Sequence, residues 1–372
     1  MRIAQIALLA ETVPPRAYGG TERVVHWLTE ELVRQGHKVT LFASGGSATS
    51  GDLVPCCASG LRDAGVRDQT ASVLVMLDRV KRAASAFDVV HFHVDLLQFP
   101  AFQNLSWKTL TTLHGRPDLP DIHPIYAAFP HMPLVSISHA QRLPMPPVNW
   151  AGTVHHGLPP SLISYSATGG AYLAFLGRIA PEKRLDRAIE IALRTETPLK
   201  IAAKIDPSDR QYFDRHIAPH LGHPLLEFVG EITDEEKKSF LGGALPLIFP
   251  IDWPEPFGLA MIEAMATGTP VIAWPNGSAP EVIDEGVTGV LVRSIQEAVQ
   301  AVQAVAQLDR SQVQRRFEAR FTAERMANEY LAIYRSLAEG GRVLHRTTQR
   351  RMMAASSIPA PGALAPRAAG AG

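Results

Sequence analysis

Residues 254–266 read Pro-Glu-Pro-Phe-Gly-Leu-Ala-Met-Ile-Glu-Ala-Met-Ala, and this stretch decides the fold more than any other. Pro256 fixes φ and Gly258 admits φ > 0, so the first part predicts a tight loop. From Leu259 onward the residues are good helix formers, so a helix is expected to follow the loop at once. The stretch therefore places Glu255 in a loop and Glu263 about one turn into a helix.

A loop that opens a helix presents backbone N–H groups to one pocket, where they favour an anion. Carboxylates suit sugar hydroxyls, so a site that offers both features suits a nucleotide sugar. The two glutamates resemble the E-x7-E element of retaining GT-B glycosyltransferases, in particular glycosyltransferase family four. This resemblance implies that Glu255 contacts hydroxyls of the transferred sugar and that Glu263 binds the ribose hydroxyls. Phe257, Gly258 and Leu259 are then expected on the donor side as well.

Size and composition place the chain among globular enzymes. Its 372 residues suffice for two domains, and 46% are hydrophobic and 19% charged. The net charge is zero, so no global attraction to nucleic acid is expected. The only cysteines, Cys56 and Cys57, are adjacent, which excludes a disulfide framework and favours a reducing cytoplasm. No run of about 18 apolar residues predicts a membrane-spanning helix.

Short apolar runs alternate with helical stretches in both halves, which predicts βαβ units and parallel sheets. Strands are expected in the first half at 3–9, 39–43, 89–93, 109–113 and 134–137, with a helix over 21–35. Prolines and glycines between 144 and 170 predict the interdomain linker. Further strands are expected at 172–176, 199–203, 226–229, 245–249, 270–273 and 290–292, with helices over 183–194 and 234–241.

The resemblance extends from Ile3 to about Leu337 and implies an α/β GT-B fold, with two facing Rossmann-like domains. We expect an N-terminal acceptor domain over 1–160 and a C-terminal nucleotide-sugar domain over 161–321. The apolar spacing over 322–338 suits a last helix that crosses back to the N-terminal domain. Residues 340–372 are basic and then rich in Ala, Pro and Gly, which predicts a disordered tail.

Residues 177–183 read Gly-Arg-Ile-Ala-Pro-Glu-Lys and resemble the G-R-x-x-P-x-K element of the same family. A nucleoside-diphosphate leaving group gains negative charge as the sugar bond breaks. Arg178 offers a planar fork of donors and Lys183 a compact charge, so both are expected to stabilise that charge. The chain contains no D-x-D pair, which many glycosyltransferases use to hold a divalent metal. We therefore expect no metal site and no cofactor beyond the donor itself.

Two elements of the first half complete the expected site. Gly19 and Gly20 precede a helix, where paired glycines let backbone approach a phosphate and Thr21 suits an N-cap. The resemblance implies that this loop lies under the donor phosphate and beside the acceptor. His114 follows a strand at the edge where open α/β sheets bind ligands. By resemblance it contacts the transferred sugar near its 6-hydroxyl, and a structural histidine is the alternative.

Weaker expectations concern four other positions. By resemblance, Ser138 lies in an acceptor-side loop, and Glu231 ends a strand where the nucleotide base is seated. Glu281 belongs to a segment that resembles a G-G-x-x-E loop, with Ser278 in place of the second glycine, and is expected to cap or brace that loop. The remaining histidines are too diffuse in sequence for a zinc site and are expected at scattered core and loop positions.

Together these features predict a retaining, metal-independent hexosyltransferase. UDP-glucose is the first donor expected and GDP-mannose the second, with a sugar, lipid-linked or small-molecule acceptor in cell-surface polysaccharide or glycolipid synthesis. A nucleotide-sugar 2-epimerase of the same fold and a non-catalytic nucleotide-sugar binding protein remain open. Residues 73–87 could form an amphipathic helix for peripheral contact with the inner face of the membrane, although packing on its own sheet is the commoner arrangement.

Overall fold

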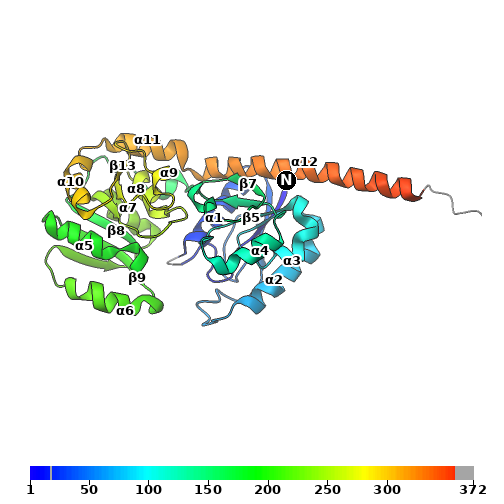
Figure 1. Cartoon of the computed structure of the whole chain (residues 1–372), viewed down its shortest axis with the longest axis horizontal. Helices are drawn as coiled ribbons and strands as arrows, with labels where there is room; N and C mark the ends of the chain where they lie inside the picture. The colour runs from blue at the N-terminus through cyan, green and yellow to red at the C-terminus, as the bar shows by residue number, and fades with distance from the viewer. Residues whose placement is uncertain (17–18, 357–372) are drawn as a thin grey trace, which may run out of the picture.

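Two parallel β-sheets organise the chain into two lobes that lie side by side (Figure 1). This computed structural model describes residues 1–16 and 19–356. Every strand pair in both sheets is parallel, so the strands are joined by crossovers, most of which place helices on the faces of the sheet, whereas β2 and β3 are joined by a loop. The predicted two-domain α/β architecture is confirmed.

The N-terminal lobe is built on a seven-stranded sheet of order β3-β2-β1-β4-β5-β6-β7. Its strands are β1 (Arg2–Ile6), β2 (Lys38–Ala43), β3 (Asp52–Pro55), β4 (Val89–Phe92), β5 (Thr109–Thr112), β6 (Leu134–Ser136) and β7 (Trp150–Thr153). Its main helices are α1 (Gly20–Arg34), α2 (Thr70–Ala83), α3 (Phe99–Phe102) and α4 (His123–Ala128). The five strands expected here are all present; four are one or two residues shorter than predicted, and β2 is one residue longer.

The C-terminal lobe is built on a six-stranded sheet of order β10-β9-β8-β11-β12-β13. Its strands are β8 (Tyr172–Ile179), β9 (Leu199–Ile205), β10 (Leu226–Gly230), β11 (Ala244–Phe249), β12 (Val271–Ala273) and β13 (Gly289–Leu291). Its helices are α5 (Leu185–Arg194), α6 (Arg210–Tyr212), α7 (Asp234–Gly242), α8 (Leu259–Ala266), α9 (Ala279–Val282), α10 (Ile295–Val305) and α11 (Arg310–Arg320). Strand order changes direction at β8 and β11, which is where open sheets of this kind bind ligands.

The last helix, α12 (Ala323–Ser356), leaves the C-terminal lobe and runs along the N-terminal lobe (Figure 1). It buries Tyr330 and Tyr334 in the N-terminal lobe, and Ile333 packs against Gly152 of β7. A methyl group at Gly152 would lie 2.8 Å from the Ile333 side chain, so β7 needs glycine there to let the helix approach. The expected return of this helix to the N-terminal domain is confirmed.

Three details differ from the expectations. The proline-rich region contains β7, because Trp150–Thr153 pairs with β6 as the seventh strand, so the linker begins after Thr153. The short strand β3 was not expected, since Asp52–Pro55 has only two apolar residues between its ends. The last helix continues to Ser356 and does not end near 338, because no proline interrupts the chain before 359. The remainder of the expected disordered tail, 357–372, lies outside the described residues.

Helix α2 packs on its own domain through Val73, Met76, Leu77 and Val80. Leu74 and Val75 remain exposed on its outer side. None of the helices within 1–16 and 19–356 combines the length and the apolar character that crossing a bilayer requires.

Candidate active site

A cleft of about 480 Å³ lies between the two domains and is lined by both of them. It gathers predicted site residues from across the whole chain. These are Gly19, Gly20, Thr21, His114, Arg178, Lys183, Glu231, Glu255, Phe257, Gly258, Leu259 and Glu263. Ser138 is not among the lining residues.

The loop that carries Glu255 follows β11 and is held by tight backbone contacts. Gly258 adopts φ 82°, and a Cβ there would lie 2.7 Å from Met261 and 2.9 Å from Phe249, so only glycine fits before α8. Gly277 packs against the same loop, where a Cβ would lie 2.2 Å from the Glu255 carbonyl oxygen. The sequence resemblance thus marks a loop whose shape depends on glycine at both points.

Ser278, which departs from the second glycine of the resembling motif, has a role in this loop. Its backbone N–H donates to the Glu255 carbonyl at 2.9 Å, and its hydroxyl donates to the Phe257 carbonyl at 2.7 Å. The side chain is fully buried. A serine in this position therefore adds a hydrogen bond that stabilises the loop carrying Glu255.

Lys183 and Glu255 form an ion pair inside the cleft. The Lys183 ammonium donates to Glu255 Oε2, and the Trp253 indole N–H donates to the same oxygen at 3.0 Å. Lys183 also lies 4.8 Å from the centre of the Trp253 ring, within reach of a cation–π contact. Trp253 could not be predicted as a site residue, because a lone tryptophan near a loop carries no motif.

Glu263 is paired with a second lysine that the sequence analysis missed. Lys237 of α7 donates to Glu263 Oε1 at 2.7 Å, and Asp234 lies 3.0 Å from the same ammonium. The Lys237 and Glu263 side chains are 8% and 5% exposed, so this is a buried ion pair. The i, i+3 spacing of Asp234 and Lys237 was the available signal, although that spacing is common on solvated helix faces.

Arg178 lies at the same side of the cleft, on β8. Its guanidinium pairs with Glu182 at 2.7 Å and with Asp209 at 3.2 Å. Its side chain is 30% exposed, so it is accessible from the cleft. The C-terminal domain therefore brings together two lysines and an arginine whose charges are balanced by carboxylates.

The N-terminal domain closes the cleft with the start of α1. The helix begins at Gly20 with Gly19 as its N-cap residue and no side-chain cap, so the expectation of Thr21 as N-cap was wrong. Gly19 lets the backbone approach Pro15 closely, because a Cβ at Gly19 would lie 2.7 Å from the Pro15 side chain. Gly20 faces Leu259 of α8 across the cleft. The N-terminal ends of two helices, one from each domain, thus meet at the cleft.

Glu22, in the first turn of α1, is a buried carboxyl that also lines the cleft. Burial raises its pKa above the usual range for a glutamate, an effect that the nearby Glu11 reinforces and the backbone and Arg62 reduce. The Glu22 carboxyl thus adds a polar group to the side of the cleft that the N-terminal domain forms.

His114 follows β5 and belongs to a cluster of histidines whose rings contact one another, with His114 stacked on His156. The His114 ring lies 5.1 Å from His93 and 5.2 Å from His156, and His93 lies 4.1 Å from His91. Burial lowers the pKa of His114 to about 3 and those of the other three well below their usual range. The expectation of scattered histidines was wrong for these four, because neighbouring parallel strands end at the same sheet edge.

Phe257 lies at the junction of the domains and is 2% exposed. Its ring centre lies 4.9 Å from that of His156 and 6.1 Å from that of Phe321. The linker and the start of α12 run beside each other here, with Leu158 and Phe321 joined by a backbone hydrogen bond of 3.0 Å. The side chain of Phe257 thus packs on the interdomain linker while its backbone stays in the loop that carries Glu255.

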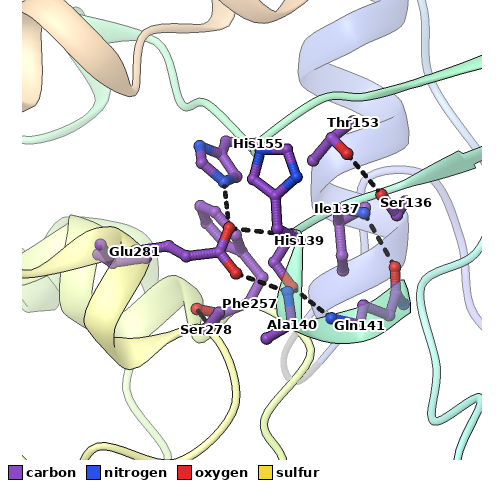
Figure 2. Close-up of polar contacts among 12 residues, drawn as sticks. Ser136, Ile137, His139, Ala140, Gln141, Thr153, His155, Phe257, Ser278 and Glu281 are labelled. Carbon is purple, nitrogen blue, oxygen red and sulfur yellow. Dashed lines mark hydrogen bonds and ion pairs between the residues drawn. The ribbon is translucent and has the colours of Figure 1, made fainter. Parts of the chain in front are cut away.

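Glu281 connects the two domains directly (Figure 2). From α9 its carboxylate accepts the backbone N–H groups of His139 at 2.8 Å and Ala140 at 2.6 Å, and it lies 3.0 Å from His155 Nε2. The expectation that Glu281 braces its own loop was incomplete, since its carboxylate binds the other domain. Burial opposes its ionisation, yet the hydrogen bonds from His155, His139 and Ala140 outweigh this and lower the pKa of Glu281.

Ser138 lies beside this interdomain contact. It is fully buried, and its hydroxyl accepts the Gln141 backbone N–H at 3.1 Å. Gln141 in turn accepts the backbone N–H of Ile137 at 2.9 Å, which closes the turn after β6 (Figure 2). Ser138 therefore shapes the turn that Glu281 binds.

Two family comparisons cover most of the chain. Residues 164–321 match the family described as glycosyl transferases group 1, and residues 18–177 match glycosyltransferase family 4. The glycogen synthase of Mycobacterium tuberculosis is 25% identical over 89% of this chain and 95% of its own length. A D-inositol 3-phosphate glycosyltransferase of Geodermatophilus obscurus is 29% identical over 53% of this chain and 45% of its own.

Solved structures share the fold. The sucrose-phosphate synthase of Thermosynechococcus elongatus superposes with a TM-score of 0.72 at 19% identity, covering 90% of this chain and 98% of its own. The HepE protein of Anabaena, crystallised with UDP and glucose, superposes with a TM-score of 0.69 at 16% identity, covering 90% of this chain and 100% of its own. At these sequence identities the superpositions show a shared fold, that is, the same arrangement of the two domains.

Proposed function

The chain belongs to the glycosyltransferases of group 1, family four, with the GT-B fold, and from this premise we propose that it moves a hexose from a nucleoside-diphosphate sugar to an acceptor hydroxyl. We further propose that the reaction retains the anomeric configuration and needs no metal ion. UDP-glucose is the first donor to test and GDP-mannose the second. One observation carries the proposal, namely the set of cations and carboxylates that line one interdomain cleft beside two helix N-termini.

The Lys183–Glu255 pair supports a role for both residues in donor binding. A diphosphate carries more charge than one carboxylate, so it would draw the Lys183 ammonium away from Glu255. Glu255 would then be free to accept hydrogen bonds from sugar hydroxyls, with the Trp253 N–H still holding one oxygen in place. Binding of donor thus replaces the Lys183–Glu255 ion pair by a pair between Lys183 and the diphosphate, and the Glu255 carboxylate is then held by hydrogen bonds from Trp253 and the sugar.

The same logic extends to the chemical step. As the bond from sugar to phosphate breaks, negative charge grows on the leaving diphosphate and positive charge on the sugar. Arg178 and Lys183 stabilise the first, and the two helix N-termini at the cleft add fixed partial positive charge. The acceptor hydroxyl would attack from the face that the diphosphate leaves, and a phosphate oxygen would take its proton. Closure of the cleft limits hydrolysis by water.

The test is a donor panel in the presence of EDTA. UDP-, GDP- and ADP-sugars would be screened for thermal stabilisation and for release of the nucleoside diphosphate. An α-glucan primer and sugar or cyclitol phosphates would serve as acceptors, since relatives named above are a glycogen synthase and an inositol-phosphate glycosyltransferase. Proton NMR of the product gives the anomeric configuration, and product analysis without acceptor separates a transferase from a 2-epimerase.

A matched pair of variants tests the charge argument. Lys183→Met removes the cation at the cleft, whereas Lys238→Met removes a lysine on α7 that pairs with Glu235 outside the cleft. We expect the first variant to lose a factor of about 100 or more in kcat, on the scale of removing one group that stabilises transition-state charge. The second should stay within twofold. Equal activity of the two variants would refute the role of Lys183, and activity lost in EDTA would refute metal independence.

A further inference from the structure

A chain of buried polar side chains connects α12 with His114 at the cleft. Tyr334 of α12 lies 3.1 Å from Gln5 Nε2, and Gln5 Oε1 lies 2.7 Å from His93 Nε2. His93 Nδ1 lies 2.9 Å from His114 Nε2. Gln5, His93 and Tyr334 are each at most 1% exposed, so bulk water cannot replace any of these contacts. Each group must therefore find its donor or acceptor within the chain itself.

The orientation of the Gln5 amide sets the direction of the hydrogen bonds. Its nitrogen faces the Tyr334 oxygen at 3.1 Å, so Gln5 donates an amide N–H to the phenol oxygen. The phenol hydrogen is then available to His91 Nδ1, which lies 2.7 Å from the same oxygen. The amide oxygen of Gln5 then faces His93, as its shorter distance of 2.7 Å also indicates.

The direction of each following bond depends on the one before it. Facing a carbonyl oxygen, His93 Nε2 must carry its hydrogen, so a neutral His93 has a lone pair on Nδ1. That lone pair can only accept, so His114 Nε2 must carry a hydrogen as well. Neutral His114 then donates its single ring hydrogen to His93, and Nδ1 of His114 is left with a lone pair. Nδ1 has no hydrogen-bond partner within the part of the chain that the structure describes.

We propose that Gln5, His93 and Tyr334 are positioning residues that hold His114 in one tautomer, with the hydrogen on Nε2 and a hydrogen-bond acceptor at Nδ1 for a ligand hydroxyl in the cleft. The identity of that ligand as a nucleotide sugar rests on the proposed function, whereas the tautomer does not. Burial keeps all the imidazoles neutral, as their lowered pKa values indicate.

This tautomer gives His114 a defined selectivity. A lone pair accepts a hydrogen from a hydroxyl group but repels a carboxylate, so the site favours a neutral sugar over a uronic acid at that point. It also excludes His114 as a proton donor to the ligand, since its only hydrogen is engaged with His93. The role of His114 would be orientation of the substrate rather than acid catalysis.

The two tyrosines of α12 offer a matched test. Tyr334→Phe removes the oxygen that orients the Gln5 amide. The amide can then flip, which reverses the direction of the hydrogen bonds from Gln5 to His114. Tyr330→Phe removes an equally buried phenol that contacts Thr112 at 2.9 Å. It reaches Tyr334 through Thr112 and His91 and makes no direct hydrogen bond with Gln5, His93 or His114 among the described residues. Protein labelled with ¹⁵N at histidine would be examined by long-range ¹H–¹⁵N NMR, with His114→Asn used to assign the signal.

We expect wild type and Tyr330→Phe to show His114 protonated on Nε2. Tyr334→Phe should move the tautomer ratio by about tenfold toward Nδ1–H, the effect of losing one orienting hydrogen bond. Should Tyr334→Phe not fold, Gln5→Met tests the same link by removing the acceptor of His93. Protonation on Nδ1 in wild type, or an unchanged ratio in the variant that folds, overturns the proposal.

Binding gives an independent readout. The donor that stabilises wild type should bind about tenfold more weakly to Tyr334→Phe and within twofold to Tyr330→Phe. The NMR measurement needs no ligand, so failure of the transferase assay leaves its result intact. The expected tautomer combined with equal donor binding by both variants would show that Nδ1 does not face the ligand, and this outcome overturns the part of the proposal that concerns binding.

Discussion

The contact of Glu281 with the N-terminal domain gives a prediction with a calculable size. Glu281→Gln keeps the shape of the side chain but leaves a single acceptor oxygen in place of two. An amide oxygen in the place of Oε2 keeps the hydrogen bonds from His139 and His155, whereas an amide N–H in the place of Oε1 faces the Ala140 N–H, so one hydrogen bond is lost. The Glu281 side chain is 19% exposed, so water offsets part of the loss. Because the lost bond ends on a charged group and leaves the Ala140 N–H without its acceptor, we expect a decrease of about 2 kcal/mol in the free energy of unfolding.

The assay is urea denaturation at pH 7, followed by tryptophan fluorescence, because both domains contain tryptophans. Glu285→Gln is the control. Its carboxylate accepts one backbone N–H, from Leu291 at 2.9 Å, within the C-terminal domain, and the residue is exposed. We expect this control to change the free energy of unfolding by less than about 0.5 kcal/mol. A Glu281→Gln variant as stable as the control would show that the interdomain contact contributes nothing.

The pH dependence gives a second check on the same residue. The pKa of Glu281 is lower in the folded protein than its ordinary value of 4.5. Its contribution is therefore complete above about pH 5.5 and is lost as pH falls through the folded-state pKa, where the carboxylate takes up a proton. We expect the difference between wild type and Glu281→Gln to narrow as the pH is lowered from 6 toward 4. A difference that grows over this range would contradict the assignment.

Three further outcomes are expected. Lys237→Met should lower the free energy of unfolding by about 3–5 kcal/mol in urea titrations, because it leaves the buried Glu263 carboxylate unpaired, and adding Glu263→Gln should recover part of the loss. Gly258→Ala should cost about 1–3 kcal/mol by the same measurement, since the new Cβ meets Phe249 and the backbone has positive φ, while a Gly286→Ala control shares the positive φ without the contact. Burial raises the pKa of Cys56 to about 11, so maleimide labelling of this thiol should stay slow at pH 8 and accelerate as pH approaches 11.

The repeating pattern of the chain was sufficient to predict the two sheets. Strands such as β1 and β11 are buried on both faces over most of their length, so their sequences are largely apolar runs that stand out between helices, although Gln5 interrupts β1. Strand β7 was missed because a short run with Gly152 at its centre lies between prolines and has little apolar character of its own. Its pairing depends on β6 and on Ile333 of α12, which are distant contacts that no local pattern contains.

The motifs of the site were predictable, but the partners of their side chains were not. Glu255, Lys183 and Arg178 lie in short segments whose glycines and prolines mark the loops. Lys237 has no motif, and only the folded chain brings it to Glu263. Trp253 lies two residues before Glu255, but its indole carries no motif that would predict the hydrogen bond. Residues near one another in sequence define a loop, whereas the lysines that neutralise the carboxylates of the site come from other elements.

The histidines illustrate the same limit at a sheet edge. His91 and His93 lie at the end of β4, His114 follows β5, and His156 follows β7. Strand order within the sheet decides which of them meet, and strand order is a property of the whole domain. Their sequence spacing suggested separate positions, although the parallel arrangement stacks their rings at one edge.

The return of α12 to the N-terminal domain has a consequence for how the protein is made. All seven strands of the first sheet have left the ribosome soon after Thr153, yet Tyr330 and Tyr334, which fill the space beside His91 and Thr112, are among the last residues of the folded part to be synthesised. The N-terminal domain must therefore wait, incompletely packed, while the entire C-terminal domain is translated. Completion of the first domain therefore depends on α12, and a nascent chain that stops before α12 would lack the two tyrosines that pack beside His91 and Thr112.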